Sequence, residues 1–310
     1  MDTNSVLYKS LYPLYKSFIS RKQKADDDSA AIWEEAYIDV VRLAKQSEME
    51  GGRIGISIKA LDSGRTISYN SSSVFDIASV IKIVVMAGAY SAIETFPGKF
   101  TPEDRARIDV LTLRMIRVSD NVARHELVKM LQDKFGNDYF YNYCKKTGLA
   151  NTSLKCSSPG DVALLLEKLY KSELFRNPDM SRKCIDLLKQ NILDNRIPRY
   201  LPAEIQKNIA HKTGTAFYNN NYWGLKIVCH DTGIVYSPKG DFIICVMIEY
   251  NVDDGKDLTP QTPTMERGIY IHNKMKELLP KGTEIIRRIS ATIYYNCIEK
   301  RPKLNPKPLL

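Results

Sequence analysis

Ser79 and Lys82 stand three residues apart, where an apolar run typical of a helix begins. Positions i and i+3 of a helix share a face, so the run from Ile81 to Ile93 would place a hydroxyl beside an amine. A serine hydroxyl is hardly ionised at neutral pH and needs a base, and Lys82 can serve when it is neutral. Burial and nearby positive charge both lower a lysine pKa, and Lys212 is a candidate source of that charge. Together with Ser119-Asp120-Asn121 and Lys212-Thr213-Gly214, which follow it in order, the pair indicates acyl transfer through a serine ester.

A helix start at Ser79 would also supply backbone N–H groups and the positive end of the helix dipole, which favour a developing oxyanion. Ser-x-x-Lys alone is a weak signal, because a chain of this length is expected to contain a match by chance. A capping serine followed by an exposed lysine would have the same pattern. The chemical interpretation therefore depends on companions elsewhere in the chain.

Ser119-Asp120-Asn121 is the first companion and lies between two helical runs. All three residue types are preferred helix caps, which is the ordinary interpretation. In the chemical interpretation Ser119 relays a proton to the leaving group. Asn121 then offers its amide to a substrate carbonyl, and Asp120 braces the loop. The sequence leaves both interpretations open.

Lys-Thr-Gly occurs twice, and the two copies have different surroundings. The copy at 146–148 follows a helical run, and its glycine fits a helix C-terminus with basic residues in the last turn. The copy at 212–214 lies on a strand pattern, where Lys212 and Gly214 share one face and Thr213 points to the other. Gly214 would permit close approach of a substrate, and the Thr215 N–H would complete an oxyanion hole with the Ser79 N–H. His211 alternates away from Lys212, which favours a structural role.

The periodicity predicts a helix, a two-stranded hairpin, a helical block, three strands and a C-terminal helical region. This order predicts an α/β lobe with an antiparallel five-stranded sheet flanked by helices, and an inserted all-α lobe. The predicted division is a leader over 1–28, an α/β lobe over 29–75 and 206–298, an all-α lobe over 76–205, and a basic proline-rich tail over 299–310. In the C-terminal region we expect one helix over about 263–279 and a separate amphipathic stretch over about 284–298. Clefts commonly form where two such lobes meet.

Composition narrows the class of protein. The 310 residues carry a net charge of +9, but the basic residues are dispersed, which argues against a nucleic-acid partner. No run approaches the roughly 20 apolar residues of a membrane span, and the N-terminus lacks the apolar region and cleavage site of a signal peptide. Six cysteines without a CxxC pair argue against a zinc site, and they fit a reducing compartment or an anaerobic cell surface better than an oxidising one. The oligomeric state is left open.

The three ordered motifs, Ser-x-x-Lys, Ser-Asp-Asn and Lys-Thr-Gly, resemble the signature of class A β-lactamases and penicillin-binding proteins. The resemblance runs from about Ala30 to about Leu279 and is greatest to class A. It implies that Ser79 is acylated and that Lys82 activates it. Further residues would then bind the substrate carboxylate and amide, shuttle protons and form the oxyanion hole: Ser119, Asn121, Lys212, Thr213 and Thr215. It implies no cofactor or metal, a β-lactam or D-Ala-D-Ala-type peptide as substrate, and a location outside the cytoplasmic membrane.

The chain departs from class A in one respect. Class A enzymes carry a Glu-x-x-Leu-Asn segment whose glutamate activates the deacylating water, whereas this chain has no glutamate between Glu126 and Glu167. The corresponding loop is about a dozen residues shorter. Because general base catalysis typically contributes about 10²–10⁴-fold, we expect acylation by β-lactams with slow hydrolysis. The alternatives are a penicillin-binding D,D-peptidase and a non-hydrolysing sensor or scaffold.

Overall fold

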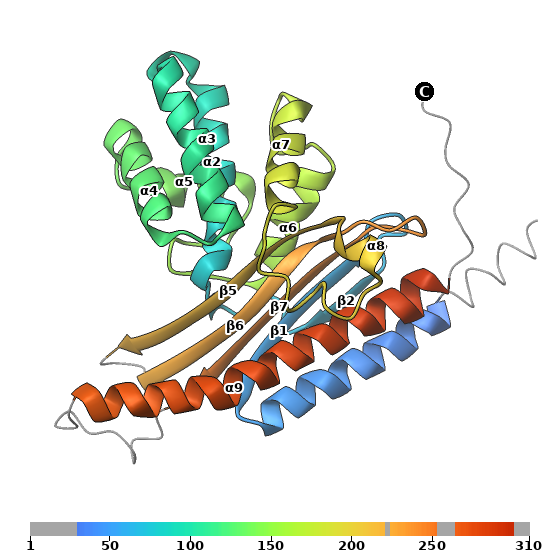
Figure 1. The fold of residues 1–310 in the computed structure, drawn as a ribbon. Coiled ribbons are helices and arrows are strands. Elements are labelled where there is room, and N and C mark those ends of the chain that lie inside the picture. Colours follow the sequence, from blue (N-terminus) through green and yellow to red (C-terminus); the bar gives the residue numbers. More distant parts are fainter. Residues whose placement is uncertain (1–29, 221–223, 253–263, 301–310) are drawn as a thin grey trace, which may run out of the picture.

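An antiparallel sheet of five strands forms the centre of the computed structural model, which describes residues 30–220, 224–252 and 264–300 (Figure 1). Its strand order is β2-β1-β7-β6-β5, and each neighbouring pair is antiparallel. The strands are β1 (Gly52–Ala60), β2 (Thr66–Tyr69), β5 (Ile209–Asn220), β6 (Gly224–Val235) and β7 (Phe242–Asn251). This architecture confirms the predicted fold class. The predicted leader and most of the predicted C-terminal tail lie outside the described residues.

Strand β7 is apolar along nearly its whole length because both faces of the sheet are covered. Ile243, Cys245 and Met247 belong to the core shared with the inserted helices. The alternate residues Ile244 and Val246 belong to the core on the opposite face. The two-residue period of a strand therefore divides one sequence run between two cores.

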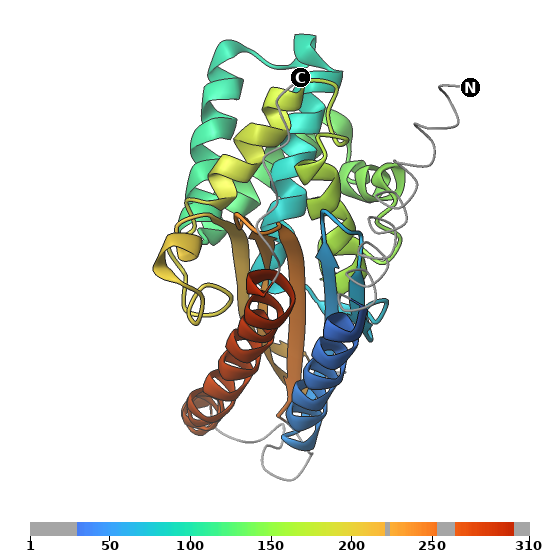
Figure 2. The same ribbon diagram turned by 90° about the vertical axis from the view of Figure 1, so that its right-hand side faces the viewer.

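Two long helices cover one face of the sheet (Figure 2). The first spans residues 30–49, and the second is α9 (Thr264–Thr292), which passes into a π-helical segment at Ile293–Glu299. The predicted break between two C-terminal helices is wrong, because α9 continues through Pro280. Proline removes one backbone donor. Here the helix buries Leu278, Ile285 and Ile286 on either side of it, which explains how packing on the sheet sustains the helix.

The other face of the sheet carries the inserted helices (Figure 1). They are α2 (Ile81–Thr95), α3 (Pro102–Arg117), α4 (Asn121–Phe135), α5 (Tyr139–Thr147), α6 (Pro159–Tyr170) and α7 (Pro178–Leu188). Short elements complete this part of the chain: β3 (Phe75–Asp76), η1 (Ala78–Val80), η2 (Pro97–Lys99), β4 (Cys156–Ser157) and α8 (Ala203–Gln206). α6 packs against β1 and β7. The segment Ala78–Thr95 is long and apolar enough to cross a membrane, but 72% of it is buried inside the protein, as expected of a core helix.

Candidate active site

Ser79 lies in the single turn η1, which leads directly into α2. The residue before it, Ala78, has φ +47°, a left-handed conformation that costs a residue with a Cβ about 1–3 kcal/mol. The turn lies against β5, where a Cβ on Gly214 would stand 3.1 Å from Val80 Cγ2 and 3.4 Å from Ala78 Cβ. Gly214 therefore allows the turn that carries Ser79 to approach the strand closely. Its expected substrate contact stays a prediction.

The buried Lys82 connects three of the predicted site residues. Its Nζ lies 2.9 Å from Ser79 Oγ and 3.0 Å from Ser119 Oγ, and it donates to Ser119 O at 2.6 Å and to Asn121 Oδ1 at 2.7 Å. The first two motifs therefore meet at a single amine. Because Asn121 Oδ1 faces the lysine, the Nδ2 group is left to donate elsewhere.

The segment Ser119-Asp120-Asn121 both caps a helix and contacts Lys82, so its capping role does not exclude a chemical one. Asp120 caps α4, accepting from Val122 N at 2.8 Å, and also accepts from Arg114 Nη2 at 2.6 Å. Its neighbours reach Lys82, and Ser119 takes φ +58° to do so. Helix capping and the proximity to Lys82 are thus properties of the same three residues.

Both motif lysines have lowered pKa values. Burial, and then the Arg124 guanidinium, lower the pKa of Lys82 to about 8, while Asp120 opposes the shift. Burial, and then the charge of Lys82, lower the pKa of Lys212 to about 7, with Asp231 opposing. The electrostatic coupling was expected to act from Lys212 on Lys82. Arg124 is the cation that lowers the pKa of Lys82, and the sequence analysis did not single it out.

Lys212 and its neighbours lie on β5. The Lys212 side chain is fully buried, and its Nζ donates to Thr213 O at 3.1 Å. Thr215 is exposed and lines the same cavity as Ser79, as the expected pairing of their N–H groups requires. The structure thus brings the strand motif beside the other two, as the sequence predicted.

Arg196 is a buried residue near the site that the sequence analysis missed. Its guanidinium donates to Gly214 O at 3.0 Å and to His230 O, and it also bonds Thr215 Oγ1. It therefore holds β5 and β6 together at the level of Lys212. No local pattern marks this arginine, because all of these partners are distant in sequence.

The histidines on β5 and β6 have structural partners. Buried His211 pairs with Asp231 Oδ1 at 3.0 Å, which agrees with the structural role expected for it. His230 accepts from Ile248 N at 3.0 Å, so its Nε2 carries the proton and donates to Asp76 O at 2.9 Å. Burial lowers the His230 pKa to about 4, which keeps the ring neutral. His230 thus anchors the segment just before Ser79, a contact that the sequence did not reveal.

A cavity of about 510 Å³ opens over Ser79 and Lys82. Its walls come from η1, the start of α4, β5 and the loop between α5 and α6. This loop, residues 148–158, is named the replacement loop after the Glu-x-x-Leu-Asn segment that it lacks. Residues that line it include Asp76, Asn121, Arg124, His125, Leu154, Lys155 and Thr215. The cavity lies between the sheet and the inserted helices, where the sequence predicted a cleft.

The replacement loop is held firmly against the segment before Ser79. β4 pairs with β3, and Ile77 N donates to Lys155 O at 3.1 Å. Ser153 Oγ accepts from the backbone N–H groups of Lys155 and Cys156 at 3.1 and 3.2 Å. These bonds form a tight turn with Leu154 and Lys155 at its tip. Both residues line the cavity.

Carboxylates near the cavity already have partners. Asp76 is the one carboxylate among the described residues that line it, and its Oδ2 accepts from Lys226 Nζ at 3.1 Å. Glu126 on α4 accepts from Arg107 Nε at 2.7 Å. Within the described part of the chain, no carboxylate stands on the replacement loop where a water-activating base would be expected.

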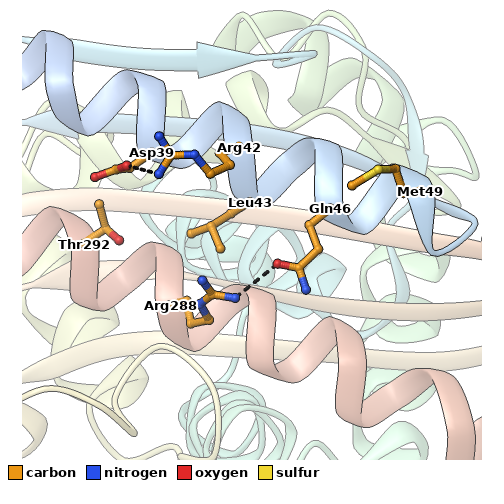
Figure 3. Close-up of a pocket in the computed structure, with 7 residues that line it drawn as sticks. All are labelled: Asp39, Arg42, Leu43, Gln46, Met49, Arg288 and Thr292. Atoms are coloured by element: carbon orange, nitrogen blue, oxygen red, sulfur yellow. Dashed lines mark hydrogen bonds and ion pairs between the residues drawn. The ribbon is translucent and has the colours of Figure 1, made fainter.

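The second Lys-Thr-Gly copy and a second groove lie away from this site. The copy of Lys-Thr-Gly at 146–148 ends α5, and Gly148 takes φ +82° as its C-terminal cap, as predicted. A second groove of about 480 Å³ lies between the N-terminal helix and α9, and is lined by Arg42, Gln46 and Arg288 (Figure 3). This groove lies on the opposite side of the sheet from Ser79 and contains no nucleophilic serine or cysteine among its lining residues. The described residues also contain no cluster of three His, Cys, Asp or Glu side chains that could hold a metal ion.

The fold and the three converging motifs place the chain in the serine β-lactamase-like superfamily. A family model described as the Beta-lactamase enzyme family matches residues 37–109 and 94–296, and the chain belongs to this family. The comparison with curated proteins gave no match.

Several solved structures share this fold. A structure of a point mutant of PBP-A, as the acyl-enzyme complex with penicillin G, is 21% identical with a TM-score of 0.61, covering 84% of this chain and 96% of that one. A β-lactamase from Sphaerobacter thermophilus DSM 20745 is 20% identical, with a TM-score of 0.61 and coverage of 83% and 96%. One from Chitinophaga pinensis DSM 2588 is 16% identical, with a TM-score of 0.63 and coverage of 84% and 98%. At these identities the likeness concerns the fold.

Proposed function

We propose that the protein is a serine hydrolase that forms an acyl-enzyme with β-lactams at Ser79. The observation that carries the proposal is the position of Lys82 Nζ, within 3.0 Å of both Ser79 Oγ and Ser119 Oγ. A pKa near 8 leaves part of the Lys82 population neutral at physiological pH. An amine in this state is a base within hydrogen-bond reach of the nucleophile.

The proposed acylation proceeds through a tetrahedral intermediate. Ser79 Oγ attacks the lactam carbonyl carbon and gives its proton to Lys82 Nζ. The carbonyl oxygen becomes an oxyanion bound by the N–H groups of Ser79 and Thr215. The C–N bond then breaks, and the leaving nitrogen takes the proton from Lys82 through Ser119, which leaves an ester on Ser79.

Substrate binding is proposed for the remaining motif residues. Asn121 Nδ2 would donate to the carbonyl of the acylamino side chain, since its Oδ1 is held by Lys82. Lys212 and Thr213 would bind the substrate carboxylate, with Gly214 between them and the oxyanion hole. Lys212 supplies the electrostatic attraction when it is protonated, below its pKa of about 7.

Deacylation is proposed to be slow. The ester on Ser79 is hydrolysed only when a water molecule beside it is activated. The residues of the loop that face Ser79 are Leu154 and Lys155. Neither side chain can accept a proton from water as a carboxylate does. Asp76 is bound to Lys226 on another side of the cavity. The acyl-enzyme should therefore persist.

Mass spectrometry after a pulse of benzylpenicillin tests the proposal. We expect the intact protein to gain the mass of one penicillin and peptide mapping to place it on Ser79, with no adduct in a Ser79→Ala variant. The adduct should last for minutes to hours after free drug is removed. Fast hydrolysis without a detectable adduct would disprove slow deacylation. If the protein neither hydrolyses benzylpenicillin nor becomes labelled by it, the proposed function itself is disproved.

A penicillin-binding D,D-peptidase is the second candidate, and the absence of a carboxylate on the described replacement loop favours it. Such an enzyme would act on peptidoglycan stem peptides outside the cytoplasmic membrane, where we propose that this protein works. Release of D-alanine from an acyl-D-Ala-D-Ala peptide, measured beside hydrolysis of benzylpenicillin, separates this function from β-lactam hydrolysis. A persistent adduct without either turnover would indicate a sensor.

A further inference from the structure

Basic side chains gather on one wall of the active-site cavity. Arg124 and His125 come from the first turn of α4, and Lys155 comes from the tip of the replacement loop. Arg124 donates to His125 Nε2, and it lies close enough to Lys82 to lower the pKa of that lysine. The exposed Lys155 is held at its backbone by Ile77. The loop and the helix thus present positive charge to the same space.

The acidic residues nearest this wall have other cations as partners. Asp120 is bound by Arg114, with 2.6 Å between Asp120 Oδ2 and Arg114 Nη2, and Glu126 is bound by Arg107. Asp76, on another side of the cavity, is bound by Lys226. No described ion pair includes Lys155. These three acids are therefore paired with cations that do not belong to the wall.

The position of Asn121 shows which part of a substrate would meet this wall. Asn121 and Arg124 are three residues apart on α4 and share a face. Both line the cavity, and Asn121 is proposed to bind the carbonyl of the acylamino side chain. The basic wall thus lies on the acyl side of the bond to be broken. The residues proposed to bind the leaving-group carboxylate, Lys212 and Thr213, come instead from strand β5.

We infer that this site selects substrates carrying a second anionic group, placed on the acyl portion and recognised by Arg124 and Lys155. The preferred substrate, whether a β-lactam or an acyl-D-Ala-D-Ala peptide, then has an acidic group on its acyl side in addition to the carboxylate of its leaving portion. This inference rests on the proposed function, because it assumes acylation of Ser79. It adds a charge requirement that the three motifs do not specify.

Two penicillins that differ by one carboxylate test the inference. Carbenicillin is benzylpenicillin with a second carboxylate on the side-chain carbon. The measured quantity is the ratio of their second-order acylation rates, carbenicillin over benzylpenicillin, obtained from adduct formation by mass spectrometry. A ratio removes any common effect of Arg124 on the reactivity of Lys82. Arg124→Gln and Lys155→Gln should each lower the ratio about three- to fivefold, as is typical of partly exposed charge pairs.

Lys129→Gln is the matched control, because Lys129 is also on α4 but pairs with Asp133 and does not line the cavity. It should leave the ratio unchanged, and added salt should lower the wild-type ratio by screening. Equal ratios in wild type and both cation variants would overturn the inference while leaving acylation of Ser79 intact. Failure of both penicillins to label Ser79 would overturn the proposed function together with it.

Discussion

Replacing Leu154 with glutamate should convert a persistent acyl-enzyme into one that hydrolyses. Leu154 is at the tip of the turn that faces Ser79, in a cavity of about 510 Å³ that has room for the slightly longer side chain. Arg124 and Lys155 line the same cavity and would favour the ionised carboxylate. The new glutamate would then be a base at neutral pH.

The expected gain follows from the typical effect of a general base and from its placement. A well-placed base contributes about 10²–10⁴-fold, while an error of about 1 Å can cost about 10²-fold. The backbone at the turn is fixed by Ser153 Oγ and by the bond from Ile77 to Lys155, so the carboxylate cannot adjust freely. We therefore expect deacylation to accelerate about 10- to 100-fold.

The assay is the decay of the penicillin adduct on Ser79 after free drug is removed, followed by mass spectrometry and by release of penicilloate. Leu154→Gln is the control, since it has nearly the same shape as glutamate and cannot act as a base. A shorter adduct lifetime in the glutamate variant alone would support the reasoning. If Leu154→Glu acylates at the wild-type rate and its adduct lasts as long as that of Leu154→Gln, the reasoning is refuted.

Three further predictions concern the groups around Ser79. The acylation rate should follow a bell-shaped pH profile with its maximum between pH 7 and 8, because Lys82 must lose its proton and Lys212 must keep its own. Lys212→Arg should remove the decline in rate at alkaline pH. A decline that persists in this variant would contradict the role assigned to Lys212. His230→Leu should lower the free energy of unfolding in urea by about 2 kcal/mol or more and slow acylation, since it removes the buried hydrogen bonds of His230 to the Ile248 N–H and the Asp76 carbonyl. Gly214→Ala should cost about 1–3 kcal/mol by overpacking against Val80 and should also slow acylation; unchanged stability by urea titration would show that the turn can move away.

The local patterns were sufficient to predict the order of strands and helices and the three motifs. Ser79 and Lys82 are close because one helical turn joins them, and Asp120 caps α4 because its residue type suits that position. The motifs also converge as expected, because the order of elements returns the chain to the sheet next to the inserted helices. These features depend on contacts within a few residues or on the overall topology.

The features that the sequence did not reveal depend on distant pairs. Arg196 bonds to groups on β5 and β6, and His230 bonds to the carbonyl of Asp76, 154 residues away. The left-handed conformation of Ala78 is maintained by its surroundings and runs against its residue type. A break was expected between about residues 279 and 284, but α9 continues through Pro280, because packing on the sheet outweighs the missing hydrogen bond. Tertiary contacts determine each of these features.

The cap at the start of α4 links the assembly of the site to the folding of the inserted helices. Asp120 holds the first turn of α4, and its two neighbours are the groups that meet Lys82. If that turn unwinds, the amine loses Ser119 and Asn121 together. Covalent labelling by penicillin therefore counts molecules in which this helix is folded, and a burst titration would serve as a chemical probe of folding in this part of the protein.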